Sequence, residues 1–322
     1  MEEQKRYEPL RLEPCLRSYL WGGTRLREEY NKTGDGVIAE SWELSVRGDG
    51  MSRIASGEHS GEPLEKLLRS DFAGMAGTRC PEETFPLLIK LIDARRDLSV
   101  QVHPSDATAR RENGEQGKTE MWYVVDCEPG STLYLGFSRA VTPEELTERA
   151  RNGTICEVLN RVRVHPGDVF FVTPGTIHAI GAGILVAEIQ QNSDTTFRVY
   201  DYNRVGADGK PRQLHLRRAA EVLRYAPSDP AADTLPPCPP DGVQEVLRCE
   251  FFRVRRAAVK THVELSTDGG SFTHLLCVRG AGSLCCGGKD YPLRQGDSYF
   301  LPAALGGYAV RGGCEILLSE IG

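Results

Sequence analysis

Residues 98–126 read LSVQVHPSDATARRENGEQGKTEMWYVVD, and this stretch indicates both a fold class and a site. It contains two runs rich in valine and aromatic residues, 98–103 and 121–126, which predict β-strands. The polar segment between them predicts a solvated loop. Because successive side chains of a strand point to opposite faces, Gln101 and His103 should project together, away from Val100 and Val102.

Strand signals dominate the rest of the chain as well. Short apolar runs bounded by Gly, Pro or Asp recur at 85–94, 168–173 and 183–191. Helical patterns are few and short, at 63–77, 142–153 and 214–225. In the second of these, Thr142 is the expected N-cap and Gly153 the expected end. The pattern predicts an all-β fold of the sandwich or jelly-roll type with a few short helices.

A weak internal repeat suggests that the chain contains two similar domains. HPGDVFFVTPGTIHAI spans 165–180, and RQGDSYFLPAALGGYAV spans 294–310. Both copies carry a Gly-Asp turn, then aromatic residues expected on a core strand (Phe171 and Phe300), then a proline. His178 follows in the first copy, where the second has a glycine, so only the first copy keeps a candidate ligand.

A Pro- and Asp-rich segment divides the chain. Residues 229–242 lack an apolar period and predict a linker. The predicted domains are therefore 1–228, with short helical additions, and 243–322, a degenerate copy of the first. In that second copy we expect His262 and His274 to be structural.

Composition excludes several classes of protein. The 322 residues are 40% hydrophobic and 26% charged, which is typical of a globular protein. A net charge of −6 without a basic block argues against a nucleic-acid partner. No apolar run approaches the roughly 20 residues that span a bilayer, and no export signal is visible. We therefore expect a cytoplasmic protein without a membrane partner, whose ten scattered cysteines are reduced.

Four polar residues on predicted strands of the first domain are candidate metal ligands: Gln101, His103, Glu120 and His178. Two imidazoles and one carboxylate suit a catalytic zinc that keeps an open position, and the Gln101 amide can add a neutral oxygen. Iron or manganese would accept the same donors. A single histidine near a strand end is more often structural. The convergence of four candidates on three predicted strands favours a site.

Further polar residues lie near these candidates. Lys118 precedes the candidate glutamate by two residues and should share its side of an extended chain, although a solvated loop lysine is the commoner case. Glu188 begins the long polar series EIQQNSDTTFRVYDYNR. Arg198, within that series, either borders the site or forms a structural salt bridge with Asp194 or Asp201.

These stretches together resemble type I phosphomannose isomerase of the short bacterial kind. The resemblance is carried by YLWGG (19–23), IAESWELS (38–45), LSVQVHP (98–104), GKTEMWYV (117–124) and VTPGTIHAIGAGILVAEIQQNSDTTFRVYDYNR (172–204), and it covers nearly the whole chain. It implies a cupin fold, that is a jelly-roll barrel, with a second cupin-like jelly roll at the C-terminus. It also implies a zinc-dependent interconversion of mannose 6-phosphate and fructose 6-phosphate through an enediol-like intermediate.

The same resemblance assigns roles to residues. It places one zinc ion on Gln101, His103, Glu120 and His178, the catalytic arginine on Arg198, and the sugar-phosphate pocket around Lys118 and Glu188. Lys118 with Arg95 or Arg96 could bind the phosphate. Two other classes stay open from the sequence: a non-catalytic sugar-binding cupin, and a metal-dependent oxygenase on the same fold.

Overall fold

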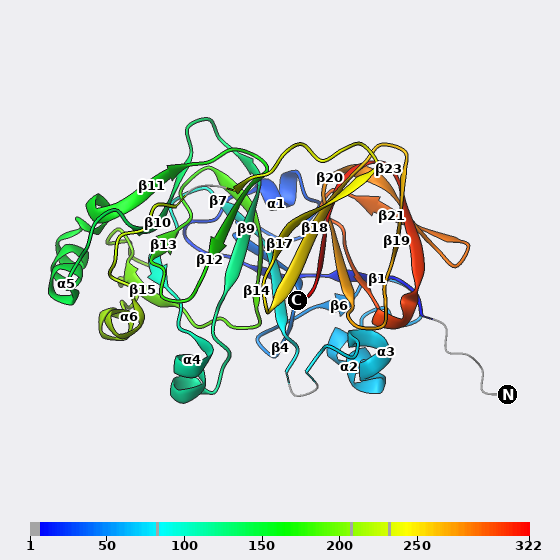
Figure 1. Cartoon of the computed structure of the whole chain (residues 1–322), viewed down its shortest axis with the longest axis horizontal. Helices are drawn as coiled ribbons and strands as arrows, with labels where there is room; N and C mark the ends of the chain where they lie inside the picture. Colours follow the sequence, from blue (N-terminus) through cyan, green and yellow to red (C-terminus); the bar gives the residue numbers. More distant parts are fainter. Residues whose placement is uncertain (1–6, 82–83, 207–208, 231–232) are drawn as a thin grey trace. The chain divides into compact units, whose positions relative to one another are not determined.

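The computed structural model describes residues 7–81, 84–206, 209–230 and 233–322 (Figure 1). Most of its elements are β-strands, which confirms the predicted all-β class. The residues cluster into two compact units. Unit 1 comprises the N-terminal segment up to Arg17, Arg25–Lys90 and Leu235–Gly322, and unit 2 comprises Ser18–Thr24 and Leu91–Thr234. The predicted N-terminal domain thus contributes to both units, and the boundaries 1–228, 229–242 and 243–322 stay a prediction.

Unit 1 is built on a nine-stranded antiparallel sheet. Its strands are β1 (Leu10–Glu13), β6 (Arg53–Ile54), β17 (Gly242–Arg248), β18 (Phe252–Val259), β19 (His262–Ser266), β20 (Thr273–Cys286), β21 (Lys289–Arg294), β22 (Ser298–Leu301) and β23 (Gly307–Ile321). The unit also holds β2 (Cys15–Arg17), α1 (Arg25–Glu28), β3 (Glu40–Leu44), β4 (Val46–Arg47), β5 (Gly50–Met51), α2 (Leu64–Ser70), α3 (Phe72–Ala76) and η2 (Ala303–Leu305). Inward-facing residues of β20 and β23, such as Leu275 and Ile316, form its apolar core.

Unit 2 contains two antiparallel sets of strands. One is a five-stranded sheet in the order β11 (Leu159–Arg163), β10 (Thr132–Phe137), β13 (His178–Ala179), β8 (Val100–Val102) and β15 (Phe197–Tyr200). The other runs β16 (Asp233–Thr234), β12 (Asp168–Val172), β9 (Glu120–Cys127) and β14 (Ile184–Gln191). Unit 2 also contains α4 (Asp106–Asn113) and η1 (Ile155–Val158). Strand β7 (Leu87–Ala94) has its first residues in unit 1 and its last residues in unit 2.

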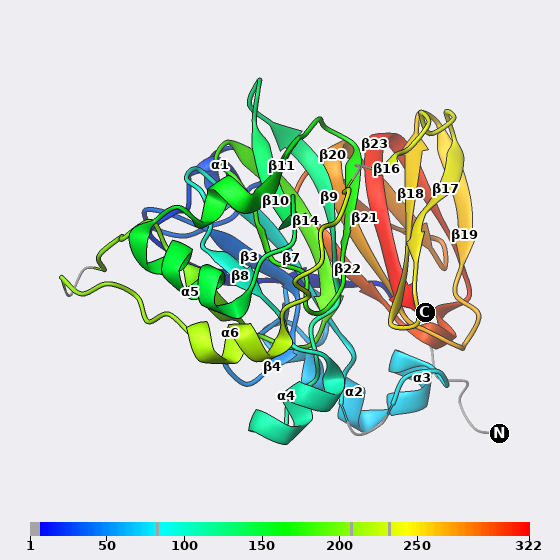
Figure 2. The same ribbon diagram turned by 60° about the vertical axis from the view of Figure 1, so that its left-hand side comes forward.

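One face of the five-stranded sheet is covered by α5 (Pro143–Asn152) and α6 (Leu216–Val222), which lie side by side (Figures 1 and 2). Val100 and Val102 of β8 pack there into an apolar core with residues of both helices. Gln101, between the two valines, must therefore face the opposite side of the sheet.

The helix at 142–153 is confirmed in detail. The Thr142 hydroxyl accepts a hydrogen bond from the backbone N–H of Glu145 at 3.2 Å, and Gly153 ends the helix in the left-handed conformation. The predicted helix at 63–77 is divided into α2 and α3. Asp71 lies between the two parts, and its carboxylate accepts from the N–H of Gly74.

Two local predictions are wrong. The solvated loop between β8 and β9 contains helix α4, because its Ala, Arg and Glu residues favour a helix that Gly114 can end at a φ of 75°. Phe171, expected in the core, is 38% exposed, whereas its neighbour Phe170 is buried. Strand alternation allows only one of the two adjacent rings to face inward.

The sequence repeat corresponds to a shared turn. In the first copy, Asp168 accepts a hydrogen bond from the N–H of His165 at 2.8 Å, and in the second Asp297 accepts from Arg294 at the same distance. The glycine before each aspartate has a positive φ. A core strand follows each turn, β12 in one unit and β22 in the other.

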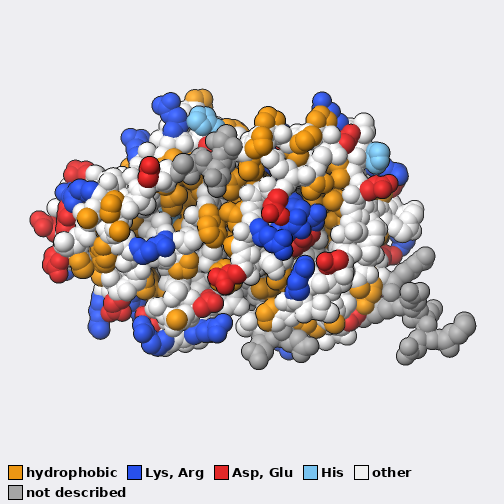
Figure 3. Space-filling view, in the orientation of Figure 1, with side chains coloured by type: hydrophobic (Ala, Val, Ile, Leu, Met, Phe, Trp, Pro, Cys, Tyr) orange, Lys and Arg blue, Asp and Glu red, His pale blue; other side chains and the backbone are white. Residues whose placement is uncertain are grey.

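Surface and thiol properties complete the description. Within the described residues, no helix combines the length and the apolar character that crossing a bilayer would require. All ten cysteines are free thiols. On the face shown in Figure 3, Lys and Arg side chains are interspersed with Asp and Glu.

Candidate functional site

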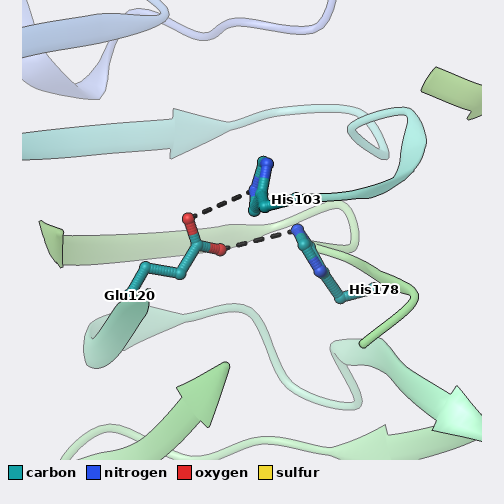
Figure 4. Close-up of side chains that lie close together, drawn as sticks. All are labelled: His103, Glu120 and His178. Atoms are coloured by element: carbon teal, nitrogen blue, oxygen red, sulfur yellow. Dashed lines mark ion pairs between the residues drawn. The ribbon is translucent and has the colours of Figure 1, made fainter. Parts of the chain in front are cut away.

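Three predicted ligands converge inside unit 2. One donor atom from each of His103, Glu120 and His178 lies within 4.8 Å of the others, and all three residues are buried. Glu120 opens β9, His103 follows β8 directly, and His178 opens β13. Figure 4 shows both imidazoles directed at the Glu120 carboxylate. The Nε2 atoms of His103 and His178 lie 3.4 Å and 3.5 Å from different oxygens of that carboxylate.

Backbone carbonyls fix the tautomer of both imidazoles. His103 Nδ1 lies 3.0 Å from the carbonyl oxygen of Thr195, and His178 Nδ1 lies 2.9 Å from that of Thr176. A carbonyl oxygen only accepts, so each Nδ1 carries the proton and each Nε2 presents a bare lone pair. Burial lowers the pKa of His103, and burial lowers that of His178 to about 3, so both rings are neutral near pH 7.

Within the part of the chain that the structure describes, no hydrogen bond satisfies the facing atoms of this cluster. Both Nε2 atoms and both Glu120 oxygens are buried without a hydrogen-bond partner among the described residues. Burial acts to raise the pKa of Glu120, but the positive charge of the Lys118 ammonium beside it holds that pKa well below its usual value. Two lone pairs and a carboxylate facing one another repel unless a cation lies between them. The donor set of two imidazoles and one carboxylate is one that zinc and other divalent ions accept.

Gln101 lies in a row of residues across the five-stranded sheet. Strand pairing places it opposite His178 on one side and Arg198 on the other. Directly opposed residues share a face of the sheet, so the three side chains project to the same side. The Gln101 amide oxygen accepts a hydrogen bond from the Ser99 hydroxyl at 3.3 Å. This row puts the amide next to the cluster of candidate metal ligands.

Lys118 lies between two carboxylates, so it is not the solvated loop lysine that the sequence left open as the commoner case. It is 3% exposed, with its Nζ 3.1 Å from Glu120 Oε2 and 3.9 Å from Glu188 Oε2. The other Glu188 oxygen accepts from the indole N–H of Trp122 at 3.2 Å. Two carboxylates therefore share one ammonium, and the excess negative charge also favours a bound cation.

Arg198 does not make the structural salt bridge considered from the sequence. Its Nη1 donates to the backbone carbonyl of Gln213 at 2.9 Å, and its Nε is buried without a partner among the described residues. Asp201 pairs instead with Arg204 and Arg212. Burial lowers the pKa of Arg198, and the nearby positive charge of Arg212 lowers it further. A guanidinium nevertheless stays protonated at physiological pH.

Several residues of this site were not predicted from the sequence. Trp122 contacts Glu188 and also packs edge-on against His178, with ring centroids 5.4 Å apart. Its place two residues after Glu120 on the same strand was an available signal. The carbonyls of Thr176 and Thr195 carried no signal, because any residue supplies a carbonyl. The sequence-predicted phosphate candidates Arg95 and Arg96 are both exposed.

Comparison with known proteins gives one consistent answer. Residues 10–127 match the family model "Phosphomannose isomerase type I, catalytic domain", and residues 243–321 match "Mannose-6-phosphate isomerase, cupin domain". The chain is 38% identical to mannose-6-phosphate isomerase ManA of Bacillus subtilis, over 98% of this chain and 99% of that protein. It is 34% identical to mannose-6-phosphate isomerase of Streptococcus mutans, over 97% and 98%.

Solved structures agree with the sequence relatives. The crystal structure of mannose 6-phosphate isomerase from Bacillus subtilis superposes with a TM-score of 0.85 at 32% identity, covering 97% of this chain and 99% of that one. A mutant of phosphomannose isomerase from Salmonella typhimurium, 18% identical, shares the fold with a TM-score of 0.76. By sequence over nearly its full length, this chain belongs to the type I phosphomannose isomerase family, whose members are also called mannose-6-phosphate isomerases.

Proposed function

We propose that the protein is a zinc-dependent aldose–ketose isomerase that interconverts mannose 6-phosphate and fructose 6-phosphate. Membership of the family supports the reaction. The observation that carries the metal dependence is the buried trio of two bare Nε2 atoms and an unprotonated carboxylate. In this proposal His103, Glu120 and His178 hold the ion, and Gln101 is the fourth ligand.

In this proposal the metal ion and the residues around it contribute different parts of the chemistry. When bound, a zinc ion supplies Lewis-acid polarisation of the substrate's carbonyl and hydroxyl oxygens. Isomerisation moves a proton between C2 and C1, so a base must take the proton from one carbon and return it to the other. Glu188 is the proposed proton carrier: Trp122 holds one of its oxygens by a hydrogen bond, and the other oxygen faces Lys118.

Positive charge is needed where the enediolate and the phosphate lie. Arg198 supplies a fixed guanidinium in the row that it forms with Gln101 and His178 (the ligand row), suited to the oxygen charge that develops during the reaction. Lys118 is the proposed sugar-binding cation because it is buried among the site carboxylates. We place the enzyme in the cytoplasm, a proposal that the ten free thiols support.

One assay tests this function. Purified protein should convert mannose 6-phosphate to fructose 6-phosphate in a coupled assay, lose that activity in excess chelator, and regain it when zinc is added back. Substrate binding without turnover would assign the chain to a sugar-binding module instead. Oxygen uptake that depends on iron would assign it to the oxygenases.

A further inference from the structure

A tight turn at Asp201–Arg204 follows β15, the strand that carries Arg198. Tyr202 and Asn203 both have a φ of 54°, and the N–H of Arg204 donates to the carbonyl of Asp201 at 3.0 Å. Two central residues with positive φ define a type I′ turn, which ordinarily takes Asn, Asp or Gly. Tyrosine is unfavourable there, so the surrounding contacts must impose this conformation.

Those contacts centre on one buried carboxylate. Asp201 is 4% exposed and accepts from Arg212 through Nε at 2.7 Å and Nη2 at 2.5 Å. It also pairs with Arg204, whose Nη1 donates to the carbonyl of Asp97 at 2.6 Å. The Arg204 guanidinium lies 5.2 Å from the centroid of the Tyr202 ring. Tyr202, although unfavourable at this position of the turn, therefore stabilises the Arg204 side chain by a cation–π contact.

The charges in this segment do not balance internally. Arg198, Arg204 and Arg212 lie around the carboxylate of Asp201, so three guanidiniums lie near this one acceptor in a chain whose net charge is −6. Without Asp201, the guanidiniums of Arg204 and Arg212 would repel each other and separate.

We propose that Asp201 is a positioning residue, which gathers Arg204 and Arg212 beside Arg198 so that the substrate's phosphate meets charges in fixed places. The proposal rests on the proposed function and adds to it how the anionic end of the substrate is held. Asp201 itself does not touch the substrate. Its carboxylate acts only through the two arginines, and the Tyr202–Asn203 turn sets the direction from which Arg204 approaches.

The substitution Asp201→Asn separates positioning from simple charge. It makes the segment more positive, so a field effect alone would lower KM for mannose 6-phosphate and strengthen inhibition by inorganic phosphate. Loss of positioning would instead raise KM for mannose 6-phosphate and weaken inhibition by phosphate. We expect KM and the inhibition constant of phosphate each to rise about tenfold, with kcat changed less than about threefold and bound zinc unchanged, as outer-shell substitutions typically cost this much.

A matched control exists on α5. Glu145 is also shared by two arginines, Arg139 and Arg149, but α5 covers the face of the sheet opposite to Gln101. Glu145→Gln should leave KM, phosphate inhibition and zinc content at wild-type values. An unchanged or lower KM in Asp201→Asn, or an equal rise in Glu145→Gln, would overturn the positioning role.

A second pair of variants covers the case in which Asp201→Asn does not fold. Arg212→Gln leaves Arg204 paired with Asp201, so KM should rise about threefold to tenfold, and Arg212→Lys should recover part of the loss. Equal KM in Arg212→Gln and wild type would contradict the proposal. Calorimetric binding of inorganic phosphate to these proteins gives the same comparison without turnover, so it stays decisive even if wild-type protein does not isomerise mannose 6-phosphate.

Discussion

A histidine can hold a metal ion only through a ring nitrogen whose lone pair is free. At both His103 and His178, a backbone carbonyl accepts the proton of Nδ1 and leaves Nε2 free, directed at Glu120. The same contacts fix the ring orientation, so the protein itself sets the geometry of the proposed ligands. Arg198 has a different position, in the ligand row but outside the trio.

This difference predicts that metal binding and turnover can be separated. His178→Ala should lower zinc affinity by more than about 100-fold, because even outer-shell changes cost about 10- to 100-fold. Activity should fall with it. Arg198→Ala should lower kcat by about 100- to 1000-fold, as removal of one fixed transition-state donor does, while keeping one zinc per chain. Metal content by elemental analysis beside a coupled assay makes the comparison.

His165 provides the control for that experiment. It lies in the same unit, its side chain is 69% exposed, and its nearest ionic partner is Asp168 rather than the ligand trio. His165→Ala should therefore retain zinc and activity. Zinc loss in Arg198→Ala equal to that in His178→Ala would show that Arg198 supports the metal site and not the reaction.

The convergence of the candidate ligands could be predicted from the sequence at this scale, but the backbone groups that hold them could not. Alternation along 98–103 puts Gln101 and His103 on one side, which is a local property of a strand. The carbonyls of Thr176 and Thr195 come from distant segments and have no residue-type signature. The pairing of Asp201 with Arg212 likewise joins residues across a turn whose tyrosine breaks the usual turn preference.

Among the elements, β8 does the most to build the site. It is only three residues long, yet it lies between β13 and β15 and so brings His178, Gln101 and Arg198 into one row. Its valines fill the core under α5 and α6, which anchors the strand independently of the metal. The strand was predictable from apolar alternation, but its neighbours were not, because strand order depends on long-range pairing.

The position of Gln101 in this row predicts that it contributes less to zinc affinity than the histidines do. Gln101→Leu keeps the volume and the core face of β8, so the protein should fold and its zinc affinity should fall only about tenfold, far less than in His178→Ala, since an amide oxygen is a weaker ligand than an imidazole. Competition with a metal indicator measures the affinity. Ser99→Ala, which removes only the hydroxyl that holds the amide, should have a smaller effect. Unchanged affinity in Gln101→Leu would remove Gln101 from the ligand set.

Each of the two compact units encloses a buried polar cluster, and the two clusters differ in whether protein groups balance their charge. In unit 2 it is the trio of His103, Glu120 and His178, for which we propose a bound cation. In unit 1 it is already neutralised, since Lys32 Nζ lies 2.7 Å from Glu43 and donates to the carbonyl of Gly296 at 2.6 Å. Next to it, His274 Nε2 lies 2.6 Å from the Ser298 hydroxyl, which donates to the carbonyl of Glu43. The expectation that His274 is structural agrees with this environment.

His274 should make the protein's stability depend on pH. Burial, then the charge of Lys32, lowers its pKa to about 3, against roughly 6.5 in an unfolded chain. Between these values the unfolded state binds a proton that the folded state does not, so the free energy of unfolding falls as pH decreases from about 6.5 toward 3. One such group contributes a slope of about 1.4 kcal/mol per pH unit. Below about pH 3 its contribution is constant.

This contribution can be measured by urea unfolding of metal-free wild-type protein and a variant without the imidazole, at pH values between about 4 and 7. The two proteins should differ in how steeply the free energy of unfolding depends on pH, by about one bound proton. His274→Gln cannot titrate and keeps an amide to meet the Ser298 hydroxyl, so its stability should decline less steeply below about pH 6.5 than that of wild type. Glu43 and the histidines of unit 2 are present in both proteins and cancel. His262→Gln, at an exposed position on β19, should follow the wild-type curve. Parallel curves for His274→Gln and wild type would mean that the buried imidazole takes up its proton without unfolding, and that the cluster in unit 1 tolerates a second cation beside Lys32.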